Sequence, residues 1–254
     1  MKVKLINIDE RENYVAKLLM AAGVAEQDIL HYLHPPASYL QDPSNLTSIA
    51  AASSLYLRIM RLEDPHIGLI VDSDVDGFTS AAIIYQYTLE IQPNAKITYY
   101  IHDGKQHGLQ DHITSLMDSD TPCDLLIIPD ASSNDKEYHD LLRTLHIPCL
   151  VLDHHDVDTD TSTNAIIVNN QISPNYINKQ LTGAGVTYQF CRYIDHVINA
   201  NYAPEFIDLA AVGIIGDMGA VTSMENRYII TQGLLNIRNP FIVAILKKQA
   251  YSIT

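Results

Sequence analysis

Cysteine and long apolar runs are both scarce in this sequence. The three cysteines among 254 residues, Cys123, Cys149 and Cys191, lie far apart and form no CxxC pair. This spacing excludes a zinc ribbon and a disulfide framework, and it is typical of proteins in a reducing cytosol. No stretch approaches the ~18–20 consecutive apolar residues of a membrane span, and residues 1–11 lack the apolar core of a signal peptide. We therefore expect a cytoplasmic protein with no membrane segment.

Positive charge is scarce as well. Sixteen Lys and Arg residues stand against 30 Asp and Glu residues, which gives a formal net charge of −14. A surface that binds nucleic acid through its phosphates needs clustered Lys and Arg, so the composition argues against a simple electrostatic DNA binder. With 47% hydrophobic and 18% charged residues, the chain is too apolar to be disordered. Its length is sufficient for one large domain, or for one domain with an appendage.

The first 64 residues are predicted to form a helical lead-in segment. Apolar residues recur at helical spacing over residues 14–22, and a second apolar run covers residues 49–60. Between them, the three prolines of HPPASYLQDPSN (residues 34–45) break any helix.

From residue 65 onward, apolar strands alternate with amphipathic helices. Short runs rich in Ile, Val and Leu lie within residues 66–74, 95–103, 123–132, 148–155 and 164–170. Helical patterns cover residues 79–90, 109–117 and 135–145, and three more follow at 187–198, 204–215 and 227–235. This alternation is typical of a parallel sheet covered on both faces. We therefore predict an α/β domain over residues 65–254, with a doubly wound parallel sheet and a helical C-terminal part.

Three of the predicted strands run directly into acidic residues. The apolar runs end at Asp72, at Asp130 and at Asp153, which is followed by His154 and His155. In an open parallel sheet, ligands bind at the carboxyl ends of the strands, near the point where the strand order reverses. These side chains should therefore meet in one crevice. The full predicted set is Asp72, Asp74, Asp76, Asp130, Asp153, His154 and His155.

So many carboxylates in one crevice predict a metal site, because they repel one another strongly unless cations lie between them. Carboxylates with imidazole suit Mn²⁺ or Mg²⁺, and Mn²⁺ is the better match to mixed oxygen and nitrogen ligands. A carboxylate shared by two metal ions about 3.5–4 Å apart is a common arrangement for in-line attack on phosphorus. Asp217 interrupts an apolar helical stretch, which favours a ligand over a helix cap.

Each motif also has an alternative interpretation. A single Asp at a strand end is commonly a turn former or a helix cap. The run from Asp72 to Gly77 resembles an EF-hand calcium loop, but Ile83 stands where that loop needs Glu, and an apolar strand precedes it. Gly183 and Gly185 lack the third glycine of a dinucleotide fingerprint, and no strand leads into them. That pair is compatible with a phosphate contact at a helix N-terminus or with close packing alone.

Taken in order, these motifs resemble those of the DHH phosphoesterases, and within that superfamily the RecJ single-strand-specific exonucleases. The resemblance covers nearly the whole chain, including a lead-in segment at HYLHPPASYLQDPSNL. It rests on DSDVDG (72–77), the strand-end Asp130, the triplet Asp153-His154-His155, LTGAGV (181–186) and LAAVGIIGDMGAVTSMENR (209–227).

The resemblance implies two metal ions, Mn²⁺ or Mg²⁺. Asp74 and Asp76 would each hold one ion, and Asp72 would complete the first site. Asp130 would bridge the two ions. The implied ligands are Asp72, Asp74, Asp76, Asp130, His154 and Asp217.

The resemblance also implies roles in catalysis. His155 would face the scissile phosphate and stabilise its charge, and Asp153 would accept a hydrogen bond from an imidazole and fix its tautomer. A metal-bound hydroxide would attack the phosphodiester in line, so no nucleophilic side chain is needed. Gly183 and Gly185 would approach the phosphate of the substrate.

The sequence departs from the family pattern in two respects. Where the family carries an Arg-containing segment ending in Gly-Tyr-Gly-Leu, this chain reads IHDGKQHGL, so Lys105 or His107 would take over phosphate binding. The second domain with its Gly-Gly-His motif (DHHA1-type) and the oligonucleotide-binding (OB) domain are absent. These parts supply much of the basic clamp, so we expect a fragment, a minimal enzyme, or a chain that a partner protein completes.

Three functions follow from the resemblance. The first is a 5′→3′ exonuclease that hydrolyses single-stranded DNA, with a role in DNA repair and recombination. The second is a phosphoesterase for short oligoribonucleotides, 3′-phosphoadenosine phosphate or cyclic dinucleotides. Those branches begin their first motif with His and have Asn-Pro before the acidic pair, whereas this chain has Asp72 and Ser73. The third, a non-catalytic replication scaffold, is disfavoured because every implied ligand is present.

Overall fold

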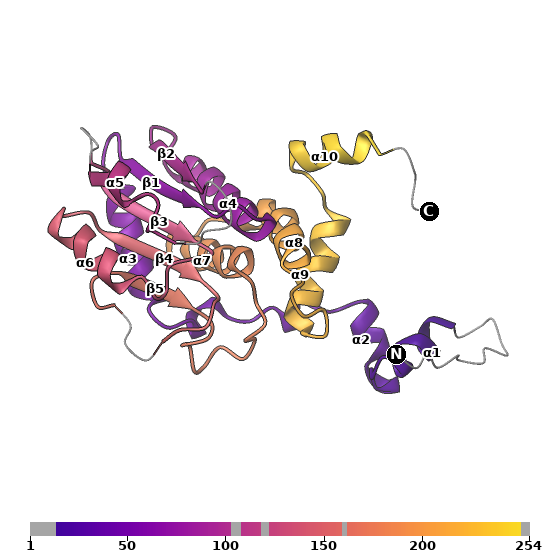
Figure 1. The fold of residues 1–254 in the computed structure, drawn as a ribbon. Helices are drawn as coiled ribbons and strands as arrows, with labels where there is room; N and C mark the ends of the chain where they lie inside the picture. The colour runs from indigo at the N-terminus through magenta and orange to yellow at the C-terminus, as the bar shows by residue number, and fades with distance from the viewer. Residues whose placement is uncertain (1–13, 103–107, 118–121, 159–161, 250–254) are drawn as a thin grey trace.

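Five apolar segments form one parallel sheet, as predicted. The computed structural model describes residues 14–102, 108–117, 122–158 and 162–249 (Figure 1). The strands are β1 (His66–Val71), β2 (Lys96–Ile101), β3 (Leu125–Pro129), β4 (Cys149–Asp153) and β5 (Ile166–Asn169). Their order is β2-β1-β3-β4-β5, with all neighbouring pairs parallel. The strand order therefore reverses between β1 and β3, which is where such sheets bind ligands.

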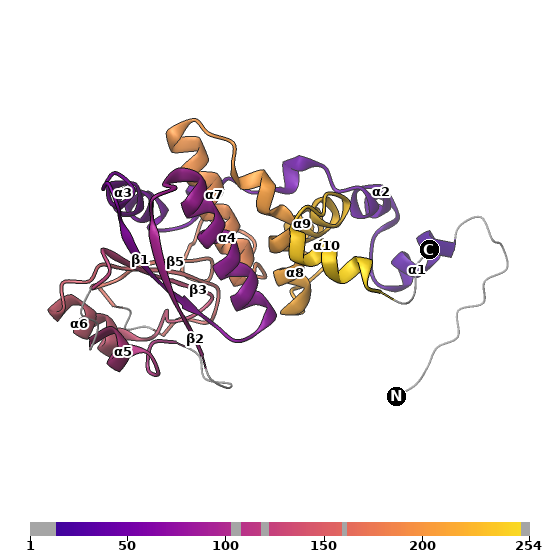
Figure 2. The same ribbon diagram turned by 90° about the horizontal axis from the view of Figure 1, so that it is seen from above.

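Helices cover both faces of the sheet (Figure 2). Alternate residues of each strand point to opposite sides, so Leu69 and Ile127 pack in one core and Ile70 and Ile128 in the other. The first core is covered by α3 (Ile49–Ile59), α4 (Val75–Ile91) and α7 (Gly183–Ile198). The second is covered by α5 (Ile113–Met117) and α6 (Lys136–Thr144). The doubly wound architecture is confirmed.

The other helices lie at the ends of the described chain. They are α1 (Tyr14–Ala21), α2 (Ile29–Leu33), α8 (Ile207–Gly216), α9 (Met224–Leu235) and α10 (Pro240–Lys247). Both α8 and α9 stand beyond the carboxyl ends of the strands (Figure 1). Within the described ranges, no single helix is long and apolar enough to cross a membrane, and only α9 and α10, bent by 68°, pass that test as a pair.

Some helix boundaries differ from the predicted ones for local reasons. α4 begins four residues before its predicted start, because Asp74 Oδ1 accepts a hydrogen bond from the backbone N–H of Gly77 at 2.8 Å and caps the helix. α10 was not predicted at all. Its start carries a recognisable signal, since Asn239 caps the helix and Pro240 occupies the first turn.

The lead-in segment is held to the rest of the molecule by α9. The buried carboxylate of Glu225 accepts hydrogen bonds from the backbone and side chain of Gln41, at 2.9 and 3.1 Å. It also accepts from Tyr176 Oη (2.8 Å), Asn178 Nδ2 (2.9 Å) and Gln189 Nε2 (2.6 Å). One acidic side chain therefore joins the lead-in, the segment after β5, α7 and α9.

A second contact from α9 supports this attachment. Arg227 Nε donates to the carbonyl oxygen of Tyr32 at 2.9 Å, and its guanidinium lies 4.3 Å from the centre of the Tyr32 ring. Further along the lead-in, Ile49 and Tyr56 of α3 are buried in the same core as the sheet.

Glu225→Ala should lower the free energy of unfolding by about 3 kcal/mol, because several buried donors lose their acceptor at once. Urea unfolding monitored by circular dichroism measures this change. The exposed Glu63→Ala is the matched control and should change stability by less than about 0.5 kcal/mol. Equal stability of both variants would show that the Glu225 contacts do not hold the lead-in segment.

Candidate metal centre

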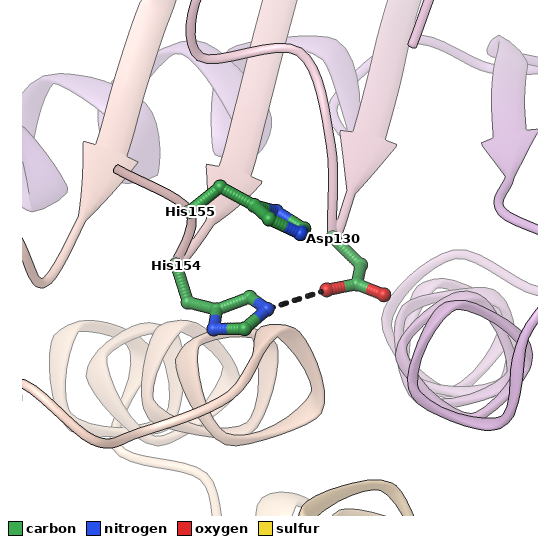
Figure 3. Close-up of side chains that lie close together, drawn as sticks. All are labelled: Asp130, His154 and His155. Carbon is green, nitrogen blue, oxygen red and sulfur yellow. Dashed lines mark ion pairs between the residues drawn. The ribbon is translucent and has the colours of Figure 1, made fainter. Parts of the chain in front are cut away.

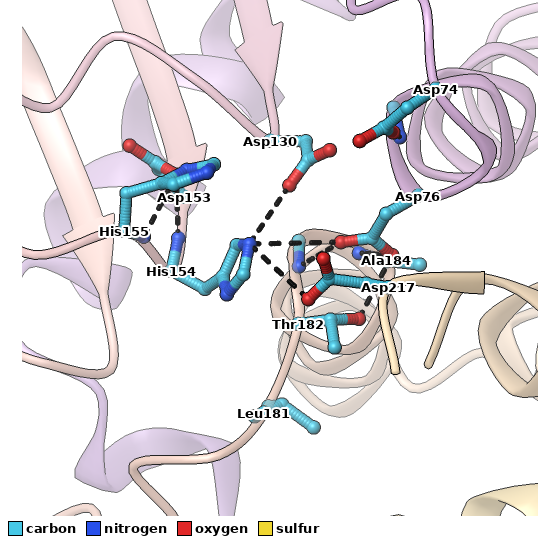
Figure 4. A network of polar contacts seen from close by, with 12 residues as sticks. Asp74, Asp76, Asp130, Asp153, His154, His155, Leu181, Thr182, Ala184 and Asp217 are labelled. Carbon is cyan, nitrogen blue, oxygen red and sulfur yellow. Dashed lines mark hydrogen bonds and ion pairs between the residues drawn. The ribbon is translucent and has the colours of Figure 1, made fainter. Parts of the chain in front are cut away.

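Acidic side chains gather at the carboxyl ends of β1, β3 and β4 (Figure 4). Asp72 follows β1, Asp130 follows β3, and Asp153 is the last residue of β4. All three are about 1% exposed. Because β1 and β3 are neighbours at the reversal of strand order, Asp72 and Asp130 lie side by side at the site where this fold binds ligands.

Asp130 combines an unusual backbone conformation with a buried carboxylate. Its φ of 66° lies in the left-handed region, which is uncommon for a residue other than glycine. Its Oδ1 atom is buried and accepts no hydrogen bond from any described residue, although His154 Nε2 lies 3.2 Å away (Figure 3). Burial, together with the charges of Asp76, Asp153 and Asp74, raises the pKa of Asp130 well above its usual value. Its Oδ1 atom is therefore available for a further contact.

Asp76 binds the N-terminus of α7. Its carboxylate accepts hydrogen bonds from Thr182 Oγ1 at 2.9 Å and from the backbone N–H groups of Gly183 (2.7 Å) and Ala184 (3.1 Å). These are free donors at a helix start, and the helix dipole favours an anion there. The contact explains why α7 begins at Gly183, four residues before its predicted start.

The two glycines of LTGAGV allow close packing. A Cβ atom at Gly183 would lie 2.2 Å from Asp130 Oδ1, and one at Gly185 would lie 2.3 Å from Leu181 Cδ1. The close approach of Asp130 is enough to explain glycine at position 183. The Gly183 N–H is already engaged, because it donates to Asp76. A phosphate contact for either glycine stays a prediction.

His154 and Asp217 complete the cluster from the other side. His154 Nε2 lies 3.9 Å from both Asp76 Oδ2 and Asp217 Oδ2 (Figure 4). Asp217 directly follows the last turn of α8. Burial and the charges of Asp76 and Asp74 raise the pKa of Asp217, while His154 acts in the opposite direction. Like Asp130, Asp217 is held near other carboxylates.

Asp153 and His155 form a hydrogen-bonded pair at the edge of the cluster. Asp153 Oδ1 accepts from His155 Nδ1 at 2.8 Å and from the His154 backbone at 2.7 Å, and Oδ2 accepts from the Ser133 backbone at 3.0 Å. Burial alone would raise the pKa of Asp153, but these hydrogen bonds and the charge of His155 outweigh it and hold the pKa below its usual value. The hydrogen bond from Asp153 in turn raises the pKa of His155 to about 8, against the opposing effect of burial.

Three overlapping groups of side chains could each hold a metal ion, because their ligand atoms lie within 4.8 Å of one another. The groups are Asp72, Asp74 and Asp130; Asp76, His154 and Asp217; and Asp130, His154 and His155. They contain five carboxylates and two imidazoles. Oxygen ligands with some nitrogen suit Mn²⁺ or Mg²⁺. The unpartnered oxygen of Asp130 and its raised pKa are consistent with such an ion.

The structure brings together eight of the residues that the sequence singled out, and Gly183 and Gly185 lie beside them. Lys105 and His107 fall outside the described residues. Sequence reasoning missed two supporting positions. Thr182, which donates to Asp76, directly precedes the glycine pair. Gly213 on α8 lies so near Asp76 that a Cβ atom would be 2.5 Å from its Oδ1, and the only signal was a glycine within an apolar helix.

Residues 66–214 match the family model described as DHH family, N-terminal domain. The chain belongs to the DHH family. It is 40% identical over 230 residues to YorK of Bacillus subtilis (strain 168), which is named as a candidate SPbeta prophage-derived single-strand DNA-specific exonuclease. It is 26% identical over 228 residues to the single-stranded-DNA-specific exonuclease RecJ of the same organism. These matches cover 91% and 88% of this chain but 37% and 28% of the relatives, so the chain spans about a third of their length.

Solved DHH structures share the fold. An exonuclease RecJ bound to manganese matches with a TM-score of 0.68 and 23% identity, over 80% of this chain and 50% of that one. RecJ from Thermus thermophilus in complex with Mn²⁺ matches with a TM-score of 0.66 and 23% identity, over 87% and 33% of the two chains.

Gly183→Ala should disturb the metal centre by displacing Asp130, because the added methyl group meets the carboxylate itself. We expect a loss of about 2 kcal/mol in the free energy of unfolding, measured in urea without metal ions. Gly185→Ala, on the same helix, meets the apolar side chain of the buried Leu181 rather than a carboxylate of the metal centre, so it should leave Asp130 in place and cost less. A larger loss for Gly185→Ala would contradict this account.

Proposed function

We propose that this chain carries the catalytic centre of a two-metal phosphodiesterase, and that the protein acts as a RecJ-like 5′→3′ exonuclease on single-stranded DNA. The observation that carries the proposal is the set of three ligand groups at the reversal of strand order, the third of which shares Asp130 with the first and His154 with the second. The named activities of YorK and RecJ support the choice of substrate. The Mn²⁺ and Mg²⁺ complexes of RecJ support the choice of ions.

The proposed ligands divide between two ions. Asp72, Asp74 and Asp130 would hold one ion, and Asp76, His154 and Asp217 would hold the other, with Asp130 shared. When bound, the ions lower the pKa of a water molecule and offset the charge of the phosphate.

His155 would contact the phosphate rather than a metal ion. Its pKa of about 8 keeps the ring largely protonated at pH 7, so it carries a positive charge beside an otherwise acidic crevice. Asp153 fixes the orientation of the ring through Nδ1. A cationic donor held in this way stabilises negative charge that develops on the phosphate oxygens during reaction.

Binding of a long single strand requires clustered positive charge, whereas acidic residues outnumber basic ones in this chain by 30 to 16. Its net charge of −14 would repel a nucleic-acid backbone outside the metal centre. A basic clamp, contributed by a further domain or by a partner protein, is therefore part of the proposal.

Asp130→Asn should abolish Mn²⁺-dependent release of mononucleotides from a 5′-labelled single-stranded DNA, because it removes the shared carboxylate while keeping its shape. We expect a loss of at least about 10²-fold in rate. Asp140→Asn, exposed on α6, is the matched control and should retain the wild-type rate. Retention of activity by Asp130→Asn would refute the mechanism. Inactivity of the wild type on DNA with activity on dinucleotides would replace the proposed substrate with short oligonucleotides.

Mn²⁺ should stabilise the folded protein, because it relieves repulsion among buried carboxylates and binds only the folded state. At a concentration 100 times the dissociation constant we expect about 2.7 kcal/mol, or a rise in melting temperature of about 5–10 °C. Differential scanning fluorimetry with Mn²⁺ and with EDTA measures the shift, and Asp130→Asn should reduce it. An unchanged melting temperature at millimolar Mn²⁺ would count against a metal centre.

A further inference from the structure

A small cavity lies next to His155, beside the proposed metal centre. Its volume is about 210 Å³, and the loop between β3 and α6 forms most of its wall, from Ala131 to Asp135. Gly108, Asp153 and His155 line the rest of it, and His155 also belongs to a ligand group with Asp130. The cavity and the metal centre therefore share His155, so that one ligand can occupy both.

One residue of this wall, Ser132, has two features that the fold does not explain. It is 8% exposed, and its hydroxyl finds no hydrogen-bond partner among the described residues. Its φ of 78° lies in the left-handed region, two residues after the equally unusual Asp130. Burial of an unsatisfied hydroxyl is costly, and strained backbone tends to occur at functional sites. Neither feature contributes to the stability of the fold.

The surrounding wall, by contrast, has its polar groups engaged. Ser133 donates its N–H to Asp153 at 3.0 Å, and its hydroxyl accepts from Asn169 Nδ2 at 2.9 Å. Asp135 Oδ2 accepts from the Leu109 N–H at 2.8 Å, which fixes the side of the cavity formed by Gly108. The Ser132 hydroxyl is therefore available to bind a ligand, and hydrogen bonds hold the wall around it in place.

The chemistry of the wall indicates the kind of ligand. Among the described residues, the cavity is lined by Asp135 and Asp153 and by no Lys or Arg, so these residues would repel a second phosphate. The volume of about 210 Å³ is below the ~300–1,000 Å³ that encloses drug-sized molecules, so the cavity suits a small neutral group with hydrogen-bonding atoms. The nucleoside next to each phosphate of a nucleic acid is a group of this kind.

We propose that the cavity receives the nucleoside joined to the scissile phosphate and that the Ser132 hydroxyl forms a hydrogen bond to it. This inference rests on the proposed phosphodiesterase function and identifies where its substrate is held. The phosphate lies at the metal centre, His155 stands between the two subsites, and Ser132 orients the nucleoside.

Two chromogenic esters test this assignment in the presence of Mn²⁺. Thymidine 5′-(p-nitrophenyl phosphate) carries a nucleoside, whereas bis(p-nitrophenyl) phosphate carries none. Ser132→Gly removes the hydroxyl at a backbone angle that glycine adopts without strain, so the variant should fold as well as the wild type. Ser54→Ala, exposed on α3, is the control for loss of a serine hydroxyl.

For the nucleoside ester we expect Ser132→Gly to lower kcat/KM by about three- to tenfold, the effect of one hydrogen bond, mainly through KM. Hydrolysis of bis(p-nitrophenyl) phosphate should stay within about twofold of the wild type. An equal loss on both esters would assign Ser132 to support of the metal centre, and no loss on either would show that the cavity does not hold the nucleoside. Either result would overturn the inference.

Failure of the proposed function has a different signature. If the wild type hydrolyses neither ester, the phosphodiesterase proposal fails, and binding of thymidine 5′-monophosphate by isothermal titration calorimetry decides the inference instead. Weaker binding by Ser132→Gly, with unchanged binding of inorganic phosphate, would support the nucleoside subsite. Equal binding of thymidine 5′-monophosphate by both proteins would overturn it.

Discussion

The carboxylate of Asp76 is the contact through which three helices meet at the edge of the sheet. It lies in the first turn of α4, accepts the free N–H groups at the start of α7, and packs against Gly213 of α8. A negative charge at a helix N-terminus is favourable, and here it also fixes the distance between α4 and α7. Asp130 lies against Gly183, which is in the first turn of α7. The position of α7 therefore determines how the acidic side chains of the crevice are arranged.

The crevice contains several features that cost free energy, and the rest of the structure offsets this cost. Asp130 combines a left-handed backbone, near-complete burial and a raised pKa, each of which costs free energy. Nearby, Asp153 is compensated in full by backbone N–H groups and by His155. These two buried carboxylates therefore differ in how the protein satisfies them. Asp153 is held by several hydrogen bonds, whereas Asp130 Oδ1 accepts none from the described residues.

The location of the crevice could be predicted because three of the strands, β1, β3 and β4, are continuous apolar runs that lead into acidic residues. The start of α7 could not, because the carboxylate that accepts its free N–H groups belongs to Asp76, which lies 107 residues before Gly183 in the sequence. The same limit applies to Glu225, whose donors come from three distant segments. Ser132 gave no signal either, since a buried hydroxyl without a partner is visible only once its surroundings are known. By contrast, the cap of α10 is local: Asn239 and Pro240 are adjacent in the sequence and predict a helix start, which sequence reasoning missed.

Anomalous diffraction from crystals soaked in Mn²⁺ tests the central claim, that the crevice is assembled to hold two cations. The account predicts two anomalous peaks about 3.5–4 Å apart, with Asp130 coordinating both and with Asp76, His154 and Asp217 around one of them. A crevice without peaks, or with a single ion that Asp130 does not contact, would contradict it.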